Sequence, residues 1–302
     1  MSVKYASDGL AKLAKLVGGI AQTSGDHPTS IPGLTLHRRN SPTEPLACIY
    51  SLSLSLVVQG EKTLFLNEQV SHYHPGHTML TSLDLPVVAH ISRASRQQPF
   101  LAVLLQLDSS EIMAVNTQLD LPRPGRDWQY QPLSIEAADN GLQDALYRLV
   151  QLLATPALRA PLLPLIKQEI LIRLLTGPHG PHLRYLVAAG SHNEQIAKVI
   201  AWLKQNFTRP LGMDELAQRA HMSASTFRAH FRAITGTSPL QYLKLLRLQE
   251  ARDLMLSKEF DASYTSALVG YESPSQFSRE YRRQFGLPPQ QDIHRLRLQG
   301  QI

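Results

Sequence analysis

The sequence has little cysteine, no long apolar run and few charged residues, and each shortage excludes a class of protein. Cys48 is the single cysteine among 302 residues, which excludes a disulfide framework or a zinc finger and fits a reducing cytosol. No apolar stretch approaches the roughly 20 residues that span a bilayer, so no membrane segment is expected. Charged residues make up 18% and hydrophobic residues 43%, which predicts a folded chain with a sizeable core. At about 150 residues per domain, the length predicts two domains.

The positive charge is concentrated towards the C-terminus. Residues 191–302 carry 15 Lys and Arg against 10 Asp and Glu, a net +5, whereas residues 1–190 carry 15 against 14, a net +1. This asymmetry predicts that one domain meets a polyanion and the other does not. An uneven charge distribution alone is weak support for nucleic-acid binding, because many protein surfaces are mildly basic, so a sequence motif is needed as well.

Short apolar bursts between turn residues, from about Gly33 to Leu107, are typical of an antiparallel barrel or sandwich. Ser51–Val58 alternates strictly with period two and predicts a half-buried strand, with Lys62–Leu66 as its hairpin partner across the turn at Gly60. Further strands are expected at His77–Leu83, Val87–Ser92 and Phe100–Leu107. Such a sheet encloses a cavity that suits a small ligand.

Helical spacing appears on both sides of the strand region. Leu10, Leu13, Leu16 and Val17 form one apolar stripe, which favours an amphipathic helix packed on the first domain over one bound to a membrane surface. Asp139–Ala154 and Leu162–Leu175 predict a helical pair, which either carries a dimer seam or simply closes off the domain. Two breaks follow, at residues 177–182 and 190–193, and the domain boundary is placed near residue 185.

The C-terminal region is an approximate duplication of a helix-turn-helix unit. The predicted helices are Met213–Ala220 and Ala224–Ile234 in the first copy, and a helix capped by Asp261 that runs to Val269 and Pro274–Phe285 in the second, with Pro239–Leu256 as the connector. A single helix-turn-helix pattern has many false positives. Two copies with matched turns and a rigid connector are far more specific for a protein that reads the DNA major groove.

The segment Gly-Tyr-Glu-Ser-Pro-Ser-Gln-Phe-Ser-Arg-Glu-Tyr-Arg-Arg-Gln-Phe-Gly, residues 270–286, closely resembles the signature of AraC/XylS-family transcriptional regulators. Residues 238–252 resemble the connector helix of that family, and the match covers about residues 195–298. In the first half, Ile31–Leu34, Val57–Lys62, Pro75–His77 and Asp84–Val87 are similar to the cupin-like effector domain of one AraC-type subgroup, over about residues 25–175.

The resemblance implies an α+β protein with two domains. Residues 1–185 would form a cupin-like antiparallel β-barrel with flanking helices, and residues 186–302 an all-α tandem helix-turn-helix domain. The expected function is a cytoplasmic, sequence-specific regulator, an activator rather than a repressor, that binds double-stranded DNA and RNA polymerase and responds to a small-molecule effector. Whether the helical pair makes a homodimer stays open between the two alternatives given above, and neither a membrane nor a cofactor is expected.

The chain departs from the family pattern in the first helix of the second copy. Ala262 and Thr265 stand where large aliphatic residues are usual, and Ser266 stands where alanine is usual. Replacing buried aliphatic side chains in this way costs about 1–3 kcal/mol each. We therefore expect this copy to be loosely folded until DNA or the first domain supports it.

The residues that meet DNA follow from the two second helices of the copies. Phe227, Phe231 and Ile234 should face inward in the first, and Phe277 and Tyr281 in the second. The expected base-contacting residues, by family position and exposed face, are Ser225, Arg228, Ala229, Ser275, Gln276 and Arg279. The expected phosphate-contacting residues are Thr226, Arg232, Lys244, Arg247, Ser278, Arg282 and Arg283. Arginine suits guanine and glutamine suits adenine, although Arg279 has Glu272 and Glu280 as alternative partners. The two helices should read segments about 10 bp apart.

A metal-dependent cupin-type enzyme or a sensor is the alternative interpretation. His72, His74 and His77 have spacing similar to a cupin metal site, but the downstream carboxylate is missing and Asp84 is the only near candidate. Polar residues on an exposed hairpin or pocket wall explain the pattern better. Cys48 is either a small buried residue or a sensor thiol. No catalytic triad or phosphate-binding loop is present, so an enzyme is not expected.

Overall fold

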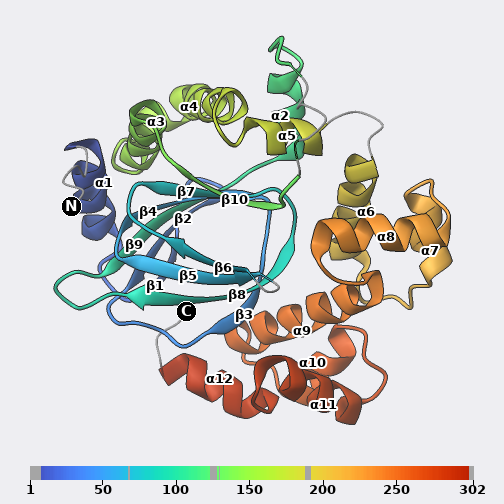
Figure 1. The fold of residues 1–302 in the computed structure, drawn as a ribbon. Helices are drawn as coiled ribbons and strands as arrows, with labels where there is room; N and C mark the ends of the chain where they lie inside the picture. Colours follow the sequence, from blue (N-terminus) through green and yellow to red (C-terminus); the bar gives the residue numbers. More distant parts are fainter. Residues whose placement is uncertain (1–7, 67–68, 123–127, 129, 188–191, 299–302) are drawn as a thin grey trace. The chain divides into compact units, whose positions relative to one another are not determined.

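A computed structural model describes residues 8–66, 69–122, 128, 130–187 and 192–298, which fall into two compact units (Figure 1). The first unit holds most of the strands and the helices before residue 187. The second consists of the helices from His192 onwards, with Leu46–Tyr50 and Leu83–Val88 grouped with it. Within the described ranges, no helix is both long and apolar enough to cross a membrane.

The strands form two sheets. They are β1 (Gly25–Pro28), β2 (Leu34–Arg39), β3 (Leu46–Tyr50), β4 (Ser53–Gln59), β5 (Glu61–Leu66), β6 (Gln69–Tyr73), β7 (His77–Thr81), β8 (Leu85–Arg93), β9 (Phe100–Gln106) and β10 (Leu133–Ala137). The first sheet has the order β1-β2-β9-β4-β7-β10 and the second β3-β8-β5-β6. The expected α+β class with antiparallel sheets is confirmed, but the strands form two sheets instead of one closed barrel.

The predicted hairpin across Gly60 is wrong. β4 pairs antiparallel with β7 and β9, whereas β5 pairs with β6, so the chain crosses from one sheet to the other at this turn. A Cβ atom on Gly60 would lie 2.6 Å from the Arg93 carbonyl oxygen, and its φ is +79°, so the crossing needs glycine. The alternating pattern predicted a half-buried strand, but both faces of β4 are buried, and even Ser55 is only 7% exposed.

Helices cover the first sheet. α1 (Asp8–Ile20) buries Leu10, Leu13 and Val17 and contacts β4 and β9, so the predicted amphipathic helix packed on the first domain is confirmed. α3 (Asn140–Gln151) lies against both α1 and α4 (Pro156–Thr176), and α2 (Ser109–Asn116) also contacts α4. A short α5 (Gly180–Leu186) follows. The predicted helical pair is present, with α4 beginning earlier than expected.

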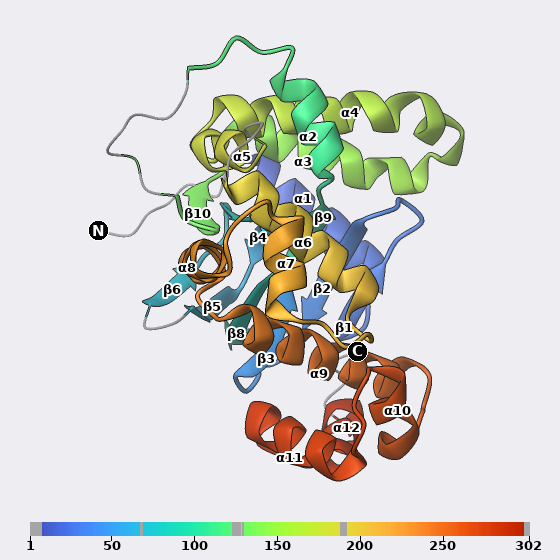
Figure 2. The same cartoon turned by 90° about the vertical axis from the view of Figure 1, so that its right-hand side faces the viewer.

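The second unit contains the two expected helix-turn-helix copies. Its helices are α6 (His192–Asn206), α7 (Met213–Arg219), α8 (Ala224–Thr235), α9 (Pro239–Ser257), α10 (Ala262–Leu268), α11 (Pro274–Phe285) and α12 (Pro289–Leu298). α9 contacts α8 of the first copy and α10, α11 and α12 of the second, so it connects the two copies (Figure 2). Of the break expected at residues 190–193, residues 190 and 191 lie outside the described residues.

The same local signals begin and end the second helix of each copy. Ser223 and Ser273 cap α8 and α11 by accepting a hydrogen bond from the backbone N–H three residues later. Each helix has 12 residues and ends at a left-handed glycine, Gly236 with φ 74° and Gly286 with φ 83°. The two helices are therefore matched in length and in capping.

Candidate DNA-binding surface

The inward face of α8 is apolar, as predicted. Phe227 and Phe231 are fully buried and Ile234 is 4% exposed, and the Phe231 ring lies 5.4 Å from the Tyr242 ring of α9. This packing turns the opposite face of α8 to solvent. Ser225, Arg228, Ala229 and Arg232 are exposed, and Thr226 is half-buried.

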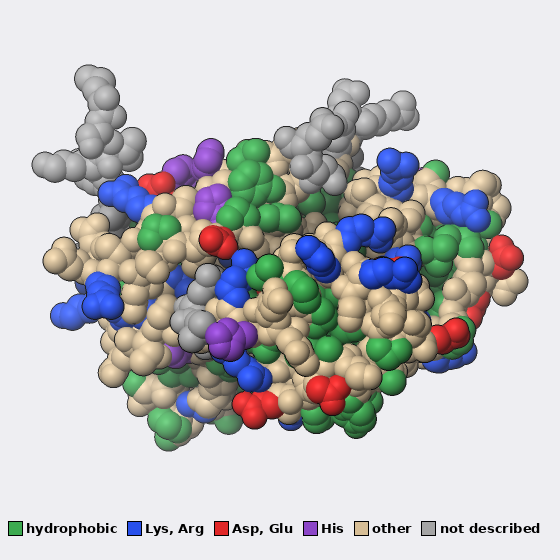
Figure 3. Space-filling model, turned by 90° about the horizontal axis from the view of Figure 1, so that it is seen from below, with side chains coloured by type: hydrophobic (Ala, Val, Ile, Leu, Met, Phe, Trp, Pro, Cys, Tyr) green, Lys and Arg blue, Asp and Glu red, His purple; other side chains and the backbone are tan. Residues whose placement is uncertain are grey.

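Two of these outward residues belong to the helix cap. The Ser223 hydroxyl accepts from the backbone N–H of Thr226 and lies 3.0 Å from the Ser225 hydroxyl and 2.8 Å from the Thr226 hydroxyl. Arg228, by contrast, has no ion-pair partner among the described residues. Its guanidinium group is therefore available to an external acceptor. Basic side chains stand out on the face of the molecule in Figure 3, with acidic ones scattered among them.

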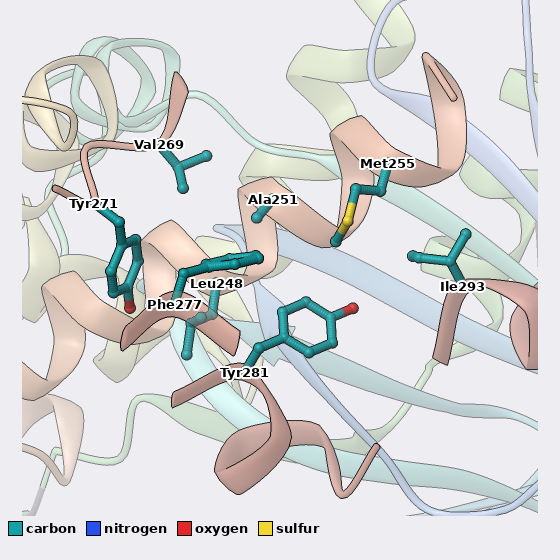
Figure 4. Close-up of a cluster of buried hydrophobic side chains, with 8 residues drawn as sticks. All are labelled: Leu248, Ala251, Met255, Val269, Tyr271, Phe277, Tyr281 and Ile293. Carbon is teal, nitrogen blue, oxygen red and sulfur yellow. The ribbon is translucent and has the colours of Figure 1, made fainter. Parts of the chain in front are cut away.

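The inward face of α11 is aromatic and belongs to the core of the second copy (Figure 4). Phe277 and Tyr281 are fully buried and their side chains point towards Leu248, Ala251 and Met255 of α9. The opposite face carries the predicted contact residues: Ser275, Gln276, Arg279, Arg282 and Arg283 are exposed, and Ser278 is half-buried.

The suggested alternative partners of Arg279 do not engage it. Glu280 instead accepts hydrogen bonds from Lys244 Nζ at 2.9 Å, Tyr271 Oη at 2.9 Å and Gln276 Nε2 at 3.2 Å. Within the described part of the chain, Arg279 makes no ion pair with either Glu272 or Glu280. It is exposed on the same helix as Gln276.

Two of the predicted phosphate-contacting residues already have partners within the unit. Lys244 is paired with Glu280, as described above. Arg247 donates to the backbone carbonyl oxygens of Phe207 at 2.7 Å and Arg209 at 2.9 Å. Both side chains thus hold α9 to its neighbours. Charge counting along the sequence misses this because it cannot separate a cation with an internal partner from a solvated one.

A buried ionic cluster in the second copy was not predicted. Asp292 is fully buried and accepts from Arg252 Nε at 2.9 Å, from Tyr281 Oη at 2.9 Å and from Arg295 at 3.0 Å. Arg252 is 2% exposed, and its guanidinium carbon lies 3.4 Å from the centre of the Phe285 ring. The one sequence signal for a buried arginine was the position of Arg252, which directly follows Ala251 on the inward face of the connector helix.

The two faces of α10 are reversed relative to an ordinary amphipathic helix. Thr265 and Ser266 are fully buried, and their hydroxyl groups donate to the backbone carbonyl oxygens of Asp261 and Ser263, each at 2.7 Å. Tyr264 is 52% exposed and Leu268 38% exposed. The small polar residues noted in the sequence are therefore interior and hydrogen-bonded, and the large apolar ones are on the surface.

The histidine cluster does not fit a metal site. The His72 and His74 ring centres are 6.4 Å apart, those of His74 and His77 are 6.1 Å apart, and His72 Nδ1 lies 3.3 Å from the Thr63 hydroxyl. Among the described residues, no group of three or more His, Cys, Asp or Glu side chains could hold a metal ion.

The remaining candidates for the alternative interpretation are Asp84 and Cys48. Burial raises the pKa of Asp84. The Asp84 carboxylate forms an ion pair with Lys204, at 2.9 Å from its Nζ atom, so an ammonium group of the chain already stands where a metal ion would have to bind. Cys48 is half-buried in β3. Its role as a sensor thiol stays a prediction.

One histidine that was not singled out is buried in the first unit. The His179 ring lies between the hydroxyl groups of Thr78 on β7, at 2.9 Å, and Ser134 on β10, at 3.0 Å. Burial, with a smaller contribution from His182, lowers the pKa of His179 to about 4. The neutral ring therefore joins the turn before α5 to the edge of the first sheet.

Two capped helix-turn-helix copies, each turning an arginine-bearing helix face to solvent, define a DNA-binding protein of the tandem helix-turn-helix class. Comparison with protein families agrees. The family described as AraC-type transcriptional regulator N-terminus matches residues 30–182, about half of the chain, and a helix-turn-helix domain family matches residues 216–295. The chain belongs to the AraC-type family of transcriptional regulators, and it is a regulator instead of an enzyme.

The curated relatives match only part of the chain. The HTH-type transcriptional regulator CdhR of Pseudomonas aeruginosa is 33% identical over 117 residues, which are 38% of this chain and 35% of that protein. The RCS-specific transcriptional activator RclR of Escherichia coli K12 is 36% identical over 85 residues, 28% of this chain and 30% of its own length. The matched region thus covers only about a third of these relatives.

Most of the chain has a fold similar to that of a solved structure. Wild-type ToxT from Vibrio cholerae, crystallised with a bound unsaturated fatty acid, has a TM-score of 0.61 at 10% identity, over 86% of this chain and 94% of ToxT. The apo form of a ToxT point variant gives a TM-score of 0.62 at 11% identity, over 88% of this chain and 99% of that one. At this identity the likeness concerns the fold alone.

Proposed function

We propose that this protein reads two major-groove segments on one face of a DNA duplex, through α8 and α11. The observation that carries the proposal is the match between these helices: both have 12 residues, both are capped by serine, and both turn polar and arginine side chains to solvent. Two such readers joined by one connector should contact segments about one helical turn, or ~10 bp, apart.

The proposed contacts follow from exposure. Bases are read by Ser225, Arg228 and Ala229 on α8 and by Ser275, Gln276 and Arg279 on α11. Phosphates are contacted by Arg232, Arg282 and Arg283, with Thr226 and Ser278 nearby on the same helices. Lys244 and Arg247 have partners within the chain, so we assign them to holding α9 in place and not to phosphate binding.

Selection of bound sites from a random duplex pool, using the full chain, tests this proposal. The expected result is a site with two preferred blocks about 10 bp apart, whose affinity falls steeply with salt because several phosphates are contacted. A site with a single block would show that only one copy reads bases. Binding that does not depend on sequence would refute base reading by both helices.

We further propose that the first unit binds a small apolar effector and thereby changes DNA binding. The support is the AraC-type family of this region and the fatty acid bound to ToxT, which has a similar fold. An effector acts by binding better to one of two arrangements of the protein and shifting their populations. A long-chain unsaturated fatty acid is the first probe: a change in DNA affinity supports this effector class, and unchanged affinity at saturating probe rejects it.

Activation through RNA polymerase is the proposed output, with the exposed face of α10 and Phe260, which comes just before that helix, as its contact surface. Phe260, Tyr264 and Leu268 are 36%, 52% and 38% exposed, and the Phe260 and Tyr264 rings are 5.0 Å apart. Large exposed apolar side chains in a group mark protein interaction sites. Tyr264→Ser should leave DNA affinity unchanged and lower transcription in a purified system, whereas the control Ser263→Ala should change neither. Full activation by Tyr264→Ser would reject this surface.

Dimerisation is proposed through α4. Leu158, Leu162 and Leu165 are 50%, 36% and 61% exposed at a spacing of four and three residues, which places them on one face of the helix. A second copy of the same face would bury them in an isologous contact. Sedimentation of the wild-type chain as a monomer at micromolar concentration would reject the proposal.

A further inference from the structure

Glu280 is the centre of a hydrogen-bond network on the second DNA-reading helix. Its side chain is 13% exposed and accepts from Lys244 of α9, from Tyr271 in the turn before α11, and from Gln276 one helical turn earlier. Burial acts to raise the pKa of Glu280, but the hydrogen bonds from Lys244, Gln276 and Tyr271 outweigh it and leave the pKa below its ordinary value. Glu280 is therefore ionised at neutral pH.

An ionised carboxylate constrains a neighbouring amide. A carboxylate has acceptors only, whereas an amide has a carbonyl oxygen and an NH₂ group. The amide nitrogen of Gln276, and not its oxygen, must therefore face Glu280, as the 3.2 Å contact between Nε2 and Oε1 records. The opposite orientation would bring two acceptors together. Glu280 thus selects one of the two orientations that a free glutamine amide adopts.

The selected orientation leaves a defined edge for a base. One N–H of the Gln276 amide donates to Glu280, and the other N–H and the carbonyl oxygen of this exposed side chain have no partner among the residues that the structure describes. This pair of groups matches N7 and the N6 amino group of adenine. A reversed amide would instead present its donor towards the O6 of guanine or the O4 of thymine. The orientation of the amide therefore decides which base is favoured.

We propose that Glu280 is a positioning residue for DNA specificity, which fixes the Gln276 amide so that the second copy prefers adenine at one position. The inference rests on the proposed function, because it needs Gln276 to face a base. It assigns to Glu280 no contact with DNA. Lys244 and Tyr271 anchor the carboxylate, but they do not set the direction of the amide.

The test compares variants on duplexes that differ only at the base pair read by Gln276. Glu280→Gln is nearly isosteric and replaces the acceptor-only group with an amide that pairs with either orientation of Gln276. A bidentate contact gives a preference of about 5- to 150-fold, and we expect Glu280→Gln to lower the adenine-over-guanine preference at least ~3-fold. The preference in the block read by α8 should be unchanged, which reports within the same molecule that the fold is intact.

Three controls separate the outcomes. Gln276→Ala should abolish the preference at the same position; if it does not, the proposed role of Gln276 fails and the inference fails with it. If Gln276→Ala abolishes the preference and Glu280→Gln retains it, only the inference is overturned. Lys244→Met and Tyr271→Phe each remove one other partner of Glu280 and should keep the preference. An equal loss in these two variants would mean that Glu280 acts only by holding the helices together.

A measurement on the wild-type chain covers the case in which Glu280→Gln weakens binding to both blocks. The two side-chain amide protons of Gln276 should differ in nuclear magnetic resonance, with one of them protected from exchange with water by the Glu280 carboxylate. Lys244→Met should keep this protection. Equal, fast exchange of both protons in the wild-type chain would overturn the inference without any variant at Glu280.

Discussion

Removing the carboxylate of Asp292 should strongly destabilise the second helix-turn-helix copy. The carboxylate is fully buried and is the ion-pair partner of Arg252, whose side chain is 3% exposed. In Asp292→Ala the guanidinium group would stay buried beside the Phe285 ring without its counter-ion. The Tyr281 hydroxyl would lose its acceptor at the same time.

The size of the effect follows from these contacts. Breaking a buried ion pair by removing one partner costs about 3–5 kcal/mol, because a charge is left uncompensated. Replacing Arg252, Asp292 and Tyr281 together by apolar groups of similar size is far less costly, since the buried guanidinium, carboxylate and hydroxyl groups are removed together and only the partly exposed Arg295 stays charged. We therefore expect the triple variant Arg252→Met, Asp292→Leu, Tyr281→Phe to recover most of the stability that Asp292→Ala loses. Arg295→Ala should cost under about 1 kcal/mol, because Arg295 is 31% exposed.

Hydrogen exchange of the full chain, followed for the backbone amides of α11, is the assay. A loss of about 3–5 kcal/mol corresponds to roughly 100- to 5,000-fold faster exchange through opening of this copy, while α8 in the first copy should be unchanged. Exchange in Asp292→Ala within ~3-fold of the wild type would refute the reasoning. So would a triple variant that exchanges as fast as Asp292→Ala.

Three further predictions concern other parts of the molecule. The pKa of His179 in the folded protein is about 4, below its ordinary value of 6.5, so the unfolded chain binds a proton more readily. The free energy of unfolding should therefore fall by roughly 3 kcal/mol as the pH falls from 6.5 through 4. Thermal melts should show this pH dependence in the wild type and a smaller one in His179→Gln. Arg228→Ala should lower discrimination in the first block by about 1–3 kcal/mol, measured by competition between duplexes, and unaltered discrimination would contradict the assignment. Leu165→Glu should convert the dimer to a monomer, measured by sedimentation. Ala160→Glu adds the same charge at an exposed position on another side of α4 and is the control that should leave the dimer intact.

The second unit was predictable from the sequence because its signals are local. Ser223 and Ser273 begin the reading helices, Pro274 occupies the first turn, and Gly236 and Gly286 end them, all within a few residues of the elements they define. The inward positions of Phe227 and Phe277 follow from helical spacing alone. The exposed candidate residues could therefore be named before the structure.

The sheets and the polar networks were not predictable in the same way. Whether β4 pairs with β5 or with β9 depends on chain segments far away in the sequence, and the short turn at Gly60 favoured the wrong partner. The Asp292 and Glu280 clusters join residues 40 and 36 positions apart, respectively, to their basic partners on α9. A sequence reports that these groups are charged, but only the packing of α9 decides which charges are internal.

The connector helix limits how the DNA sites of such a protein can change during evolution. α9 has 19 residues, so it is roughly 28 Å long, and it contacts both copies. One inserted residue would rotate the second reading helix by about 100° relative to the first and carry it away from the groove. Seven inserted residues would bring the two faces back to within about 20° of alignment, but they would add roughly 10 Å, or ~3 bp, over which the duplex itself turns by about 100°. The length of α9 therefore holds the spacing between the two half-sites, and the bases within each half-site are the part of the operator that is free to vary gradually.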